Sequence, residues 1–247
     1  IHNRIIKKHF IMNVAGLVDI IKETKMNWRF IFESPLYDNI NFIPGQLVQI
    51  GIPWNDKWGS GGDWLTRNYS VASYPDNTNK FELIVTYLPG GKMSDYLFNE
   101  AKIGDEIIYR GPMGVFTLPD NLLERYIFLV STGSGVSPFR SMINNIYNKN
   151  IPFKKINLYF GTRKESDLLY RQEFEKIAKE LPNFNYKPTL SQEDKHGFRK
   201  GHVHEHYLND IDTNNKPLVY FCGWDRMITE GRIKLDAMGF QMQKDIR

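Results

Sequence analysis

Residues 125–138 read RYIFLVSTGSGVSP, and this stretch decides the fold of the second half of the chain. An unbroken apolar run enters a turn with two glycines, and a stretch of helical character follows the turn. Continuous apolar runs are typical of parallel strands that are buried on both faces. Pro138 suits the start of a helix, where its missing N–H costs no hydrogen bond. The order strand, Gly-x-Gly, helix favours a nucleotide site here over a plain connecting turn.

The same alternation continues toward the end of the chain. Apolar runs INLYF and LVYFC are each followed by a helix-like stretch, QEFEKIAKEL after the first and MITEGRIKLDAMG after the second. Strands that alternate with helices predict parallel βαβ units. We therefore expect an α/β nucleotide-binding domain over residues 120–247, after the polar link PDNLLER.

The first half of the chain has a different pattern. Short runs such as WRFIFES, LVQIGI, FELIVTYL and EIIYRG are separated by Pro-Gly, Gly-Gly and Asp-Asn pairs, which predicts an antiparallel barrel or sandwich over residues 1–119. Phe81, Leu83, Val85 and Tyr87 alternate with other residues, so we expect them on one face of a half-buried strand.

The composition argues against several classes of function. The 32 basic and 28 acidic residues give a net charge of +4, without a basic tract of the kind that binds nucleic acid. Cys222 is the one cysteine, so the chain forms no intrachain disulfide and holds no iron–sulfur cluster by itself. Because no run of about 18 apolar residues occurs, we expect a cytoplasmic protein without a membrane partner.

Two motifs in the first half carry polar chemistry. Arg67, Tyr69 and Ser70 lie on an expected strand, where a cation, a ring and a hydroxyl suit a diphosphate and a flat heterocycle. The alternative is an ordinary strand with an exposed arginine. The turn Pro89-Gly90-Gly91 precedes a short helix whose first N–H groups suit a phosphate, and the alternative is a plain hairpin turn and helix cap.

Two further motifs lie near the end of the chain. Cys222 and Gly223 follow an expected buried strand, so the thiol lies where parallel sheets bind ligands, unless it is a structural cysteine. His202 and His206 have the i,i+4 spacing of helical metal ligands. No third ligand is evident, so we expect no metal site.

Taken in this order, the motifs resemble the ferredoxin-NADP reductase superfamily, particularly its bacterial members, over residues 13–240. The resemblance implies that Arg67 holds the FAD diphosphate, Tyr69 lies against the isoalloxazine and Ser70 lies by its N5 atom. It also assigns Val85 to backbone contacts with the flavin. The phosphate loop of the family matches Gly91, Lys92, Met93 and Ser94, and its G-P-x-G-x-F segment matches residues 111–116.

The resemblance also implies the nucleotide site. The pyridine-nucleotide turn matches Thr132, Gly133 and Gly135, with Ser131 in place of the first glycine of the family. Arg163 matches an arginine that approaches the nucleotide. Cys222, Gly223 and Met227 match the turn that holds the nicotinamide. We assign Ser70 and Cys222 positioning or polarising roles at the reacting atoms, because hydride transfer needs no proton abstracted from carbon.

Three positions bear on the preference for NADPH or NADH. Relatives specific for NADP often carry Ser-Arg where this chain has Ser191 and Gln192, and often an arginine where it has His202. Arg163, Arg199 and Lys200 are cations that compensate for a missing guanidinium. We expect NADPH, with NADH as the alternative.

The resemblance implies an enzyme that transfers electrons between NADPH and ferredoxin or flavodoxin, an acidic one-electron carrier, by hydride transfer at FAD N5. An NADH-dependent reductase component of an oxygenase system is the first alternative. A flavin-binding module without turnover is the second. The sequence leaves the oligomeric state open.

Overall fold

The structure is a computed structural model that describes residues 5–7, 10–35, 39–53 and 64–247. It divides into two compact units, Ile1–Thr117 with Arg140–Met142, and Leu118–Phe139 with Ile143–Arg247. The first unit carries an antiparallel sheet and the second a parallel sheet with helices. The expected fold class, an antiparallel β domain followed by an α/β domain with a parallel sheet, is confirmed.

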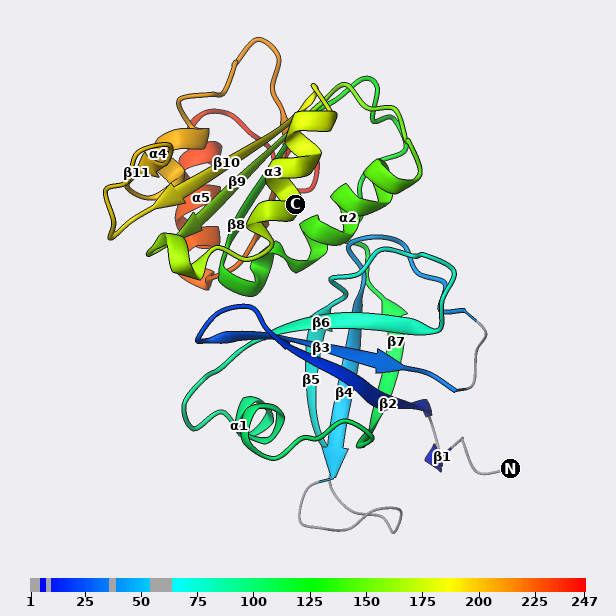
Figure 1. The fold of residues 1–247 in the computed structure, drawn as a ribbon. Helices are drawn as coiled ribbons and strands as arrows, with labels where there is room; N and C mark the ends of the chain where they lie inside the picture. The colour runs from blue at the N-terminus through cyan, green and yellow to red at the C-terminus, as the bar shows by residue number, and fades with distance from the viewer. Residues whose placement is uncertain (1–4, 8–9, 36–38, 54–63) are drawn as a thin grey trace. The chain divides into compact units, whose positions relative to one another are not determined.

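The first unit is a seven-stranded sheet with one short helix among its described residues (Figure 1). The strands pair in the order β5-β4-β7-β2-β3-β6, and β1 pairs with β2 off this path. The elements are β1 (Ile5–Lys7), β2 (Phe10–Lys22), β3 (Asn27–Glu33), β4 (Leu47–Pro53), β5 (Trp64–Ser70), β6 (Lys80–Thr86), α1 (Lys92–Asn99) and β7 (Glu106–Met113).

The two end strands of this sheet are joined by hydrogen bonds just beyond β5. The backbone N–H of Ala72 donates to the carbonyl of Glu82 at 2.8 Å, and the N–H of Glu82 donates to Ser73 Oγ at 3.1 Å. The chain that leaves β5 is therefore fastened to β6. The sheet closes into a barrel, which removes its open edges.

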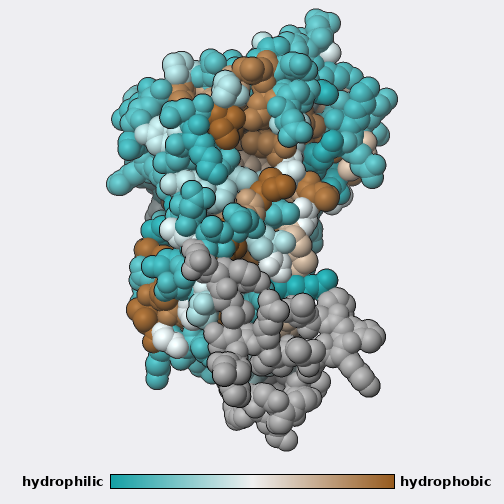
Figure 2. Space-filling model, turned by 90° about the vertical axis from the view of Figure 1, so that its right-hand side faces the viewer, coloured by the Kyte–Doolittle hydropathy of each residue, from teal (hydrophilic) through white to brown (hydrophobic). Residues whose placement is uncertain are grey.

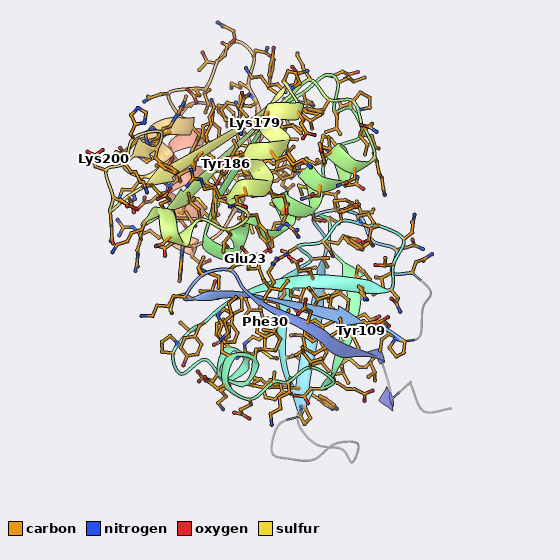
Figure 3. The ribbon with its side chains drawn as sticks, viewed as in Figure 1. Glu23, Phe30, Tyr109, Lys179, Tyr186 and Lys200 are labelled. Atoms are coloured by element: carbon orange, nitrogen blue, oxygen red, sulfur yellow. The ribbon has the colours of Figure 1, made fainter. Side chains whose placement is uncertain are left out.

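Aromatic side chains fill the interior of the barrel. Phe30 and Tyr109 are almost fully buried and lie within the first unit, as Figure 3 shows. The rings of Phe32 and Phe81 stack with centroids 5.5 Å apart. Burial of each such ring contributes roughly 1.5–3 kcal/mol. The hydroxyl of Tyr109 is satisfied because it hydrogen-bonds to Ser34 Oγ at 2.9 Å.

Strand β6 differs from its sequence expectation. Residues 81–85 are buried without alternation, and Tyr87 lies beyond the end of the strand at Thr86. Glu82 is buried on the face that was expected to be solvated. Its carboxylate is compensated by two arginines, since Arg140 Nη1 lies 3.0 Å from Glu82 Oε1 and Arg29 Nη1 lies 3.2 Å from Glu82 Oε2. The half-buried assignment was wrong because an ion pair satisfies a charge inside the unit.

The second unit is a five-stranded parallel sheet in the order β11-β10-β9-β8-β12, with α2 to α5 alternating with its strands (Figure 1). Residues 127–131 of β8 are all buried, as the apolar run predicted. The elements are β8 (Tyr126–Thr132), η1 (Gly133–Val136), α2 (Ser137–Asn148), β9 (Lys155–Thr162), η2 (Glu165–Asp167), α3 (Arg171–Glu180), β10 (Phe184–Leu190), β11 (Arg199–Lys200), α4 (Val203–Tyr207), β12 (Leu218–Cys222) and α5 (Asp225–Ala237).

The last residues of the chain add to the β12 edge of this sheet. The N–H of Val219 donates to the carbonyl of Asp245 at 2.9 Å, and Arg247 N–H donates back to the carbonyl of Val219 at 2.8 Å. Phe221 N–H donates to the carbonyl of Arg247 at 3.1 Å. Strand β12 is therefore hydrogen-bonded on both sides, which fixes the turn that follows Cys222.

Most of the coloured surface in Figure 2 is hydrophilic, with apolar residues in separate patches. The large apolar side chains with the highest exposure include Val115 at 93%, Ile233 at 65% and Trp224 at 64%. Within the described ranges, every helix is too short or too polar to cross a bilayer.

Candidate functional site

Strand β5 positions the first candidate motif. It pairs with β4 so that Tyr69 lies opposite Val48 and Arg67 opposite Ile50. Arg67 is exposed, whereas Tyr69 is half-buried and packs against the barrel core. Burial raises the pKa of Tyr69 to about 12, and the nearby charge of Arg67 acts in the opposite direction. The phenol is therefore neutral at physiological pH and offers an apolar ring beside an exposed cation.

Ser70 ends strand β5, at the seam where the barrel closes. Its half-buried side chain makes no hydrogen bond to any residue that the structure describes. The closing bond of the seam runs from Ala72 to Glu82, so Ser70 and Val85 lie on the two strands that flank it. Because the side chain of Val85 is buried, this residue has only its backbone to offer a ligand.

The turn before α1 is held by a single hydroxyl. Ser94 Oγ accepts from the N–H of Leu88 at 3.1 Å and lies 2.9 Å from the carbonyl oxygens of Leu88 and Gly91. Ser94 and Met93 are buried, and Lys92 is exposed. The Ser94 hydroxyl is thus occupied by the turn itself. Within residues 91–94 the groups open to a phosphate are the first N–H groups of the helix, which have no acceptor inside it.

These features of the first unit fit a flavin. An isoalloxazine needs a flat apolar surface with polar contacts at its rim, and the half-buried Tyr69 ring and the unbonded Ser70 hydroxyl supply both. A diphosphate needs cations and N–H donors, which Arg67 and the start of α1 supply. Helix α1 also lies in contact with β5, so the two motifs belong to one region.

The segment at residues 111–116 begins in the last residues of β7, continues beyond the strand and is anchored to the loop before β4. Gln46 Nε2 donates to the carbonyl of Gly114 at 3.2 Å. The segment leaves Gly114 and Val115 exposed, while Phe116 is half-buried. It closes the first unit as the sequence pattern indicated.

The glycine turn of the second unit forms a short 3-10 helix, η1, directly before α2. Gly133 has φ +55, a left-handed conformation that favours glycine. A Cβ atom at Gly135 would lie 2.5 Å from Gly223 N and closer still to the carbonyl of Cys222. Gly135 is therefore required by the neighbouring turn of the protein, and Gly133 is the glycine that faces open space.

The turn after β12 interlocks with the glycine turn. Gly223 lies so close to Thr132 that a Cβ atom there would lie 2.9 Å from Thr132 N and nearer still to Thr132 Oγ1. The N–H of Trp224 donates to Thr132 Oγ1 at 3.1 Å. The structure thus brings Thr132 and Gly135 against Cys222 and Gly223 at the carboxyl end of the sheet, where ligands of such sheets bind, and Gly133 lies between them in the chain.

Cys222 is half-buried at this end of β12, level with Ser131 on β8. Burial raises the pKa of its thiol to about 11, so the thiol is protonated at neutral pH. Ser131 Oγ is buried and has no hydrogen-bond partner among the described residues. Met227 packs in the core with Val203 and Phe221, so its side chain holds α5 in place.

Arg163 and Ser191 follow the next two strands along the same edge. Strands β9 and β10 are parallel, and Thr162 pairs with Leu190 at their ends. The next residues, Arg163 and Ser191, therefore lie on neighbouring backbone. Ser191 N–H donates to the carbonyl of Thr162 at 2.9 Å, and Gln192 N–H donates to that of Arg163 at 2.9 Å. Arg163 is exposed, and its guanidinium has no ion-pair partner in the described part of the chain.

The other two candidate cations are already paired. Arg199 Nη1 lies 3.3 Å from Asp210 Oδ2, and Lys187 Nζ lies 2.7 Å from the same oxygen. Burial raises the pKa of Asp210, but hydrogen bonds from Lys187 and Tyr159 outweigh it, so the net shift is downward. Lys200 Nζ lies 2.9 Å from Asp194 Oδ2. Of the three, Arg163 is the cation most available to a nucleotide.

The histidine cluster is not arranged as the spacing suggested. His202 precedes α4 as its N-cap, so His202 and His206 do not share a helical face. His206 Nε2 lies 2.9 Å from the carbonyl of Lys200, while His204 is buried beside Tyr207. The shared face was a wrong expectation because the helix begins one residue later than the pattern implied.

One residue of the site has no counterpart in the sequence expectations. Trp224 is 64% exposed, yet its backbone is fixed by Thr132. Apart from adjacent residues of its own turn, the described atom nearest to a Cβ atom at Gly133 would be Trp224 Nε1, at 3.7 Å. A tryptophan after Cys-Gly was visible in the sequence, but its proximity to Gly133 depends on the pairing of β8 with β12.

Comparisons with known proteins agree with this arrangement. Residues 16–118 match the oxidoreductase FAD-binding domain, and residues 129–232 match the oxidoreductase NAD-binding domain. Ferredoxin--NADP reductase B of Sorangium cellulosum is 34% identical over 195 residues, which cover 76% of this chain and 76% of that protein.

Other relatives are longer than this chain. The electron transfer component of anthranilate 1,2-dioxygenase from Acinetobacter baylyi is 31% identical over 92% of this chain. The chain spans 63% of that protein, and 66% and 59% of two further dioxygenase electron transfer components.

Solved structures have the same fold. A cytochrome P450 reductase from Amycolatopsis superposes with a TM-score of 0.82 at 25% identity, covering 96% of this chain and 69% of that one. A ferredoxin NADP+ reductase from Neisseria gonorrhoeae with bound FAD and NADP gives a TM-score of 0.80 at 19% identity, covering 96% and 97%. The chain therefore belongs to the ferredoxin-NADP reductase superfamily, with an FAD-binding domain followed by an NAD(P)-binding domain.

Proposed function

We propose that this protein is a flavin-dependent reductase that moves electrons between NADPH and a one-electron protein carrier such as ferredoxin or flavodoxin. The observation that carries the proposal is the occurrence of both matched domains in one chain, each with its ligand motif on described backbone. We take residues 1–119 as the flavin domain and residues 120–247 as the nucleotide domain.

A bound flavin supplies the chemistry that joins the two carriers, because it exchanges a hydride with nicotinamide and single electrons with iron–sulfur or haem proteins. The residues of this chain supply placement. Tyr69 offers an apolar ring, Ser70 a hydroxyl at the barrel seam, and Arg67 a cation for the diphosphate. Precise orientation of reactants accounts for a large part of barrier reduction in such reactions.

On the nucleotide side, the interlocked turns set the position of the nicotinamide half. Gly133 leaves room for the dinucleotide, and Thr132 is held by Gly223 and Trp224. Because the Cys222 thiol has a pKa of about 11, it keeps its proton and acts by position and polarity, without exchanging a proton with substrate. Ser70 has the matching role on the flavin side.

For the nucleotide we propose NADPH, on the strength of Arg163 and Ser191. Arg163 and Ser191 follow β9 and β10 on neighbouring backbone, and the exposed Arg163 guanidinium suits a 2'-phosphate. Arg199 and Lys200 contribute less to binding of the 2'-phosphate, because they form ion pairs with Asp210 and Asp194. NADH is the alternative, and a direct comparison of the two nucleotides tests it.

A second candidate is an NADH-dependent reductase component of an oxygenase system. The names of several relatives favour it, since they are electron transfer components of dioxygenases. In that case the acceptor is an iron–sulfur protein supplied separately, because this chain has one cysteine. In both cases the net charge of +4 favours an acidic partner through faster encounter. A cytoplasmic location stays a prediction.

An anaerobic titration of the purified protein with NADPH and, separately, NADH tests the proposal. We expect the visible flavin absorbance to bleach on addition of the preferred nucleotide. Steady-state reduction of added ferredoxin, flavodoxin or an oxygenase iron–sulfur protein then separates the two candidate acceptors. A yellow protein that neither nucleotide reduces would instead support a flavin-binding module without turnover, and a colourless protein that cannot be reconstituted with FAD would overturn the proposal.

A further inference from the structure

We propose that Arg140 is a positioning residue for the flavin reaction, whose guanidinium fixes the backbone that follows Ser70. This inference rests on the proposed function, and it gives a role to a side chain to which the resemblance assigns none. Arg140 lies in helix α2, and residues 140–142 of that helix group with the barrel as one compact unit. Its side chain is 13% exposed, and a charge so far removed from water needs partners that compensate it.

The guanidinium of Arg140 holds two oxygen atoms at the barrel seam, where the chain after β5 is bonded to β6. Its Nη1 atom donates to the carbonyl of Ala72 at 3.0 Å and to Glu82 Oε1 at 3.0 Å. The same two residues are joined through their backbones, because the N–H of Ala72 donates to the carbonyl of Glu82 at 2.8 Å. A guanidinium is planar and presents its N–H groups in fixed directions, so it constrains the groups that it bonds more than an ammonium does. Arg140 therefore fixes the seam with a side chain, in addition to the backbone bond.

Ser70 is the candidate flavin residue that this arrangement positions. The N–H of Val71 donates to the carbonyl of Gln46 at 3.0 Å, and Ala72 is bonded through both its N–H and its carbonyl. Val71 and Ala72 are fully buried, so water does not readily replace a bond that their peptide groups lose. Without the guanidinium, the Ala72 carbonyl loses a donor and the backbone that follows Ser70 gains freedom. The Ser70 hydroxyl then no longer has one fixed position, and hydride transfer depends on orientation of this kind.

Arg29 separates this role from simple charge compensation. It lies on β3, with its Nη1 atom 3.2 Å from Glu82 Oε2, and its side chain is 20% exposed. Both arginines therefore neutralise the carboxylate of Glu82, one at each oxygen. The bond to the Ala72 carbonyl belongs to Arg140. Removal of either arginine should destabilise the barrel, whereas removal of Arg140 should also displace the backbone that follows Ser70.

The test compares Arg140→Ala with Arg29→Ala in the full-length protein loaded with FAD. Visible circular dichroism reports the surroundings of the bound flavin, and stopped-flow mixing with the preferred nucleotide gives the limiting rate of flavin reduction. We expect Arg140→Ala to change the flavin dichroism and to lower the limiting rate about tenfold, while the Kd for the nucleotide changes by less than about threefold. Arg29→Ala is expected to keep the wild-type dichroism and a rate within about twofold of the wild-type rate, although both variants unfold at a lower temperature than the wild type.

A double variant separates positioning from charge, because Arg140→Ala leaves the carboxylate of Glu82 with one partner fewer. Arg140→Ala combined with Glu82→Gln has no such carboxylate and keeps the backbone bonds of residue 82. We expect it to reduce its flavin about tenfold more slowly than Glu82→Gln alone and to differ from it in flavin dichroism. This pair also serves if Arg140→Ala alone does not retain FAD.

Equal rates and equal dichroism in that pair, or an equal loss in Arg29→Ala, would mean that Arg140 only neutralises Glu82, and would overturn the inference while leaving the proposed function intact. A wild-type flavin that neither nucleotide reduces overturns the proposed function, and the flavin dichroism of the variants then still tests Arg140.

Discussion

The two glycine turns of this protein are built in different ways. Before α1, the turn at Gly90 and Gly91 is fastened by the hydroxyl of Ser94, and a Cβ atom at Gly90 would meet nothing within 4 Å. Before α2, Gly135 is enclosed by the backbone of Cys222 and Gly223. The first turn depends on one side chain, whereas the second depends on two backbones in contact. The nucleotide turn should therefore tolerate substitution least.

The largest expected effect follows from Gly135→Ala. The added methyl group meets backbone atoms that cannot move independently, so we expect a loss of about 3 kcal/mol in unfolding free energy. For a chain of this size the unfolding midpoint would fall by roughly 6 to 12 °C, measured by calorimetry. The control is Gly16→Ala, where a Cβ atom meets nothing within 4 Å. Equal midpoints for the two variants would show that the turns are not interlocked.

A smaller effect is expected at the flavin turn. Ser94→Ala removes the hydroxyl that links Leu88 and Gly91, which costs about 1–3 kcal/mol because the N–H of Leu88 loses its acceptor. Since the start of α1 would lose its alignment, we expect FAD affinity to fall about tenfold, measured by flavin fluorescence during dilution. Ser166→Ala, an exposed serine of the second unit, serves as the control. Unchanged flavin affinity in Ser94→Ala would remove this turn from the flavin site.

Arg163→Ala tests the preference for NADPH at the edge of the parallel sheet where its strands end. Loss of a guanidinium that bonds a phosphate should raise the KM for NADPH about tenfold and leave the KM for NADH nearly unchanged. Lys164→Ala is the matched control, because it removes a neighbouring exposed cation. If both variants change the two KM values equally, Arg163 acts only through general charge, and the preference for NADPH loses its support.

The smallest expected effect is a pH dependence at Cys222. Its pKa is raised by burial to about 11 from an ordinary value of 9, so the folded state holds the proton more tightly than the unfolded state. This contribution to stability is full below pH 9 and is lost as pH rises from 9 to 11. Tyr69, with a pKa raised to about 12, adds its own loss only above pH 10.

In Cys222→Ala, the fall of the unfolding midpoint between pH 9 and pH 10 should be smaller than in the wild type by about 2 to 4 °C. Ser137→Ala, at the start of α2, is expected to keep the wild-type slope because serine does not titrate in this range. An identical slope in Cys222→Ala and wild type would show that the thiol is more open to water than the structure indicates.

Much of the fold could be predicted from local pattern. The apolar run before Thr132 and the alternation that follows it predicted the parallel sheet, and the position of Arg67 to Ser70 on a strand was also correct. These features depend on neighbours in the sequence. Strand β11 was missed because two residues, Arg199 and Lys200, carry no periodic signal.

The rest depends on contacts between distant segments. The buried charge of Glu82 is compensated by Arg29 and Arg140, which are distant in the sequence, and an alternating pattern cannot reveal those partners. The need for glycine at position 135 comes from Cys222, and the position of Trp224 comes from Thr132. Both relations join β8 to β12 across the sheet. The motifs located the residues of the candidate site, and the pairing of strands assigned their neighbours.

The measurement that tests the central claim most directly is the anaerobic titration of the flavin-loaded protein with NADPH and NADH. Transfer of a hydride from nicotinamide to flavin predicts rapid bleaching of the visible flavin band by the preferred nucleotide, at one equivalent per flavin. A yellow protein that neither nucleotide reduces would contradict it, and would mean that the interlocked turn at Thr132 and Gly223 is not a working nicotinamide site.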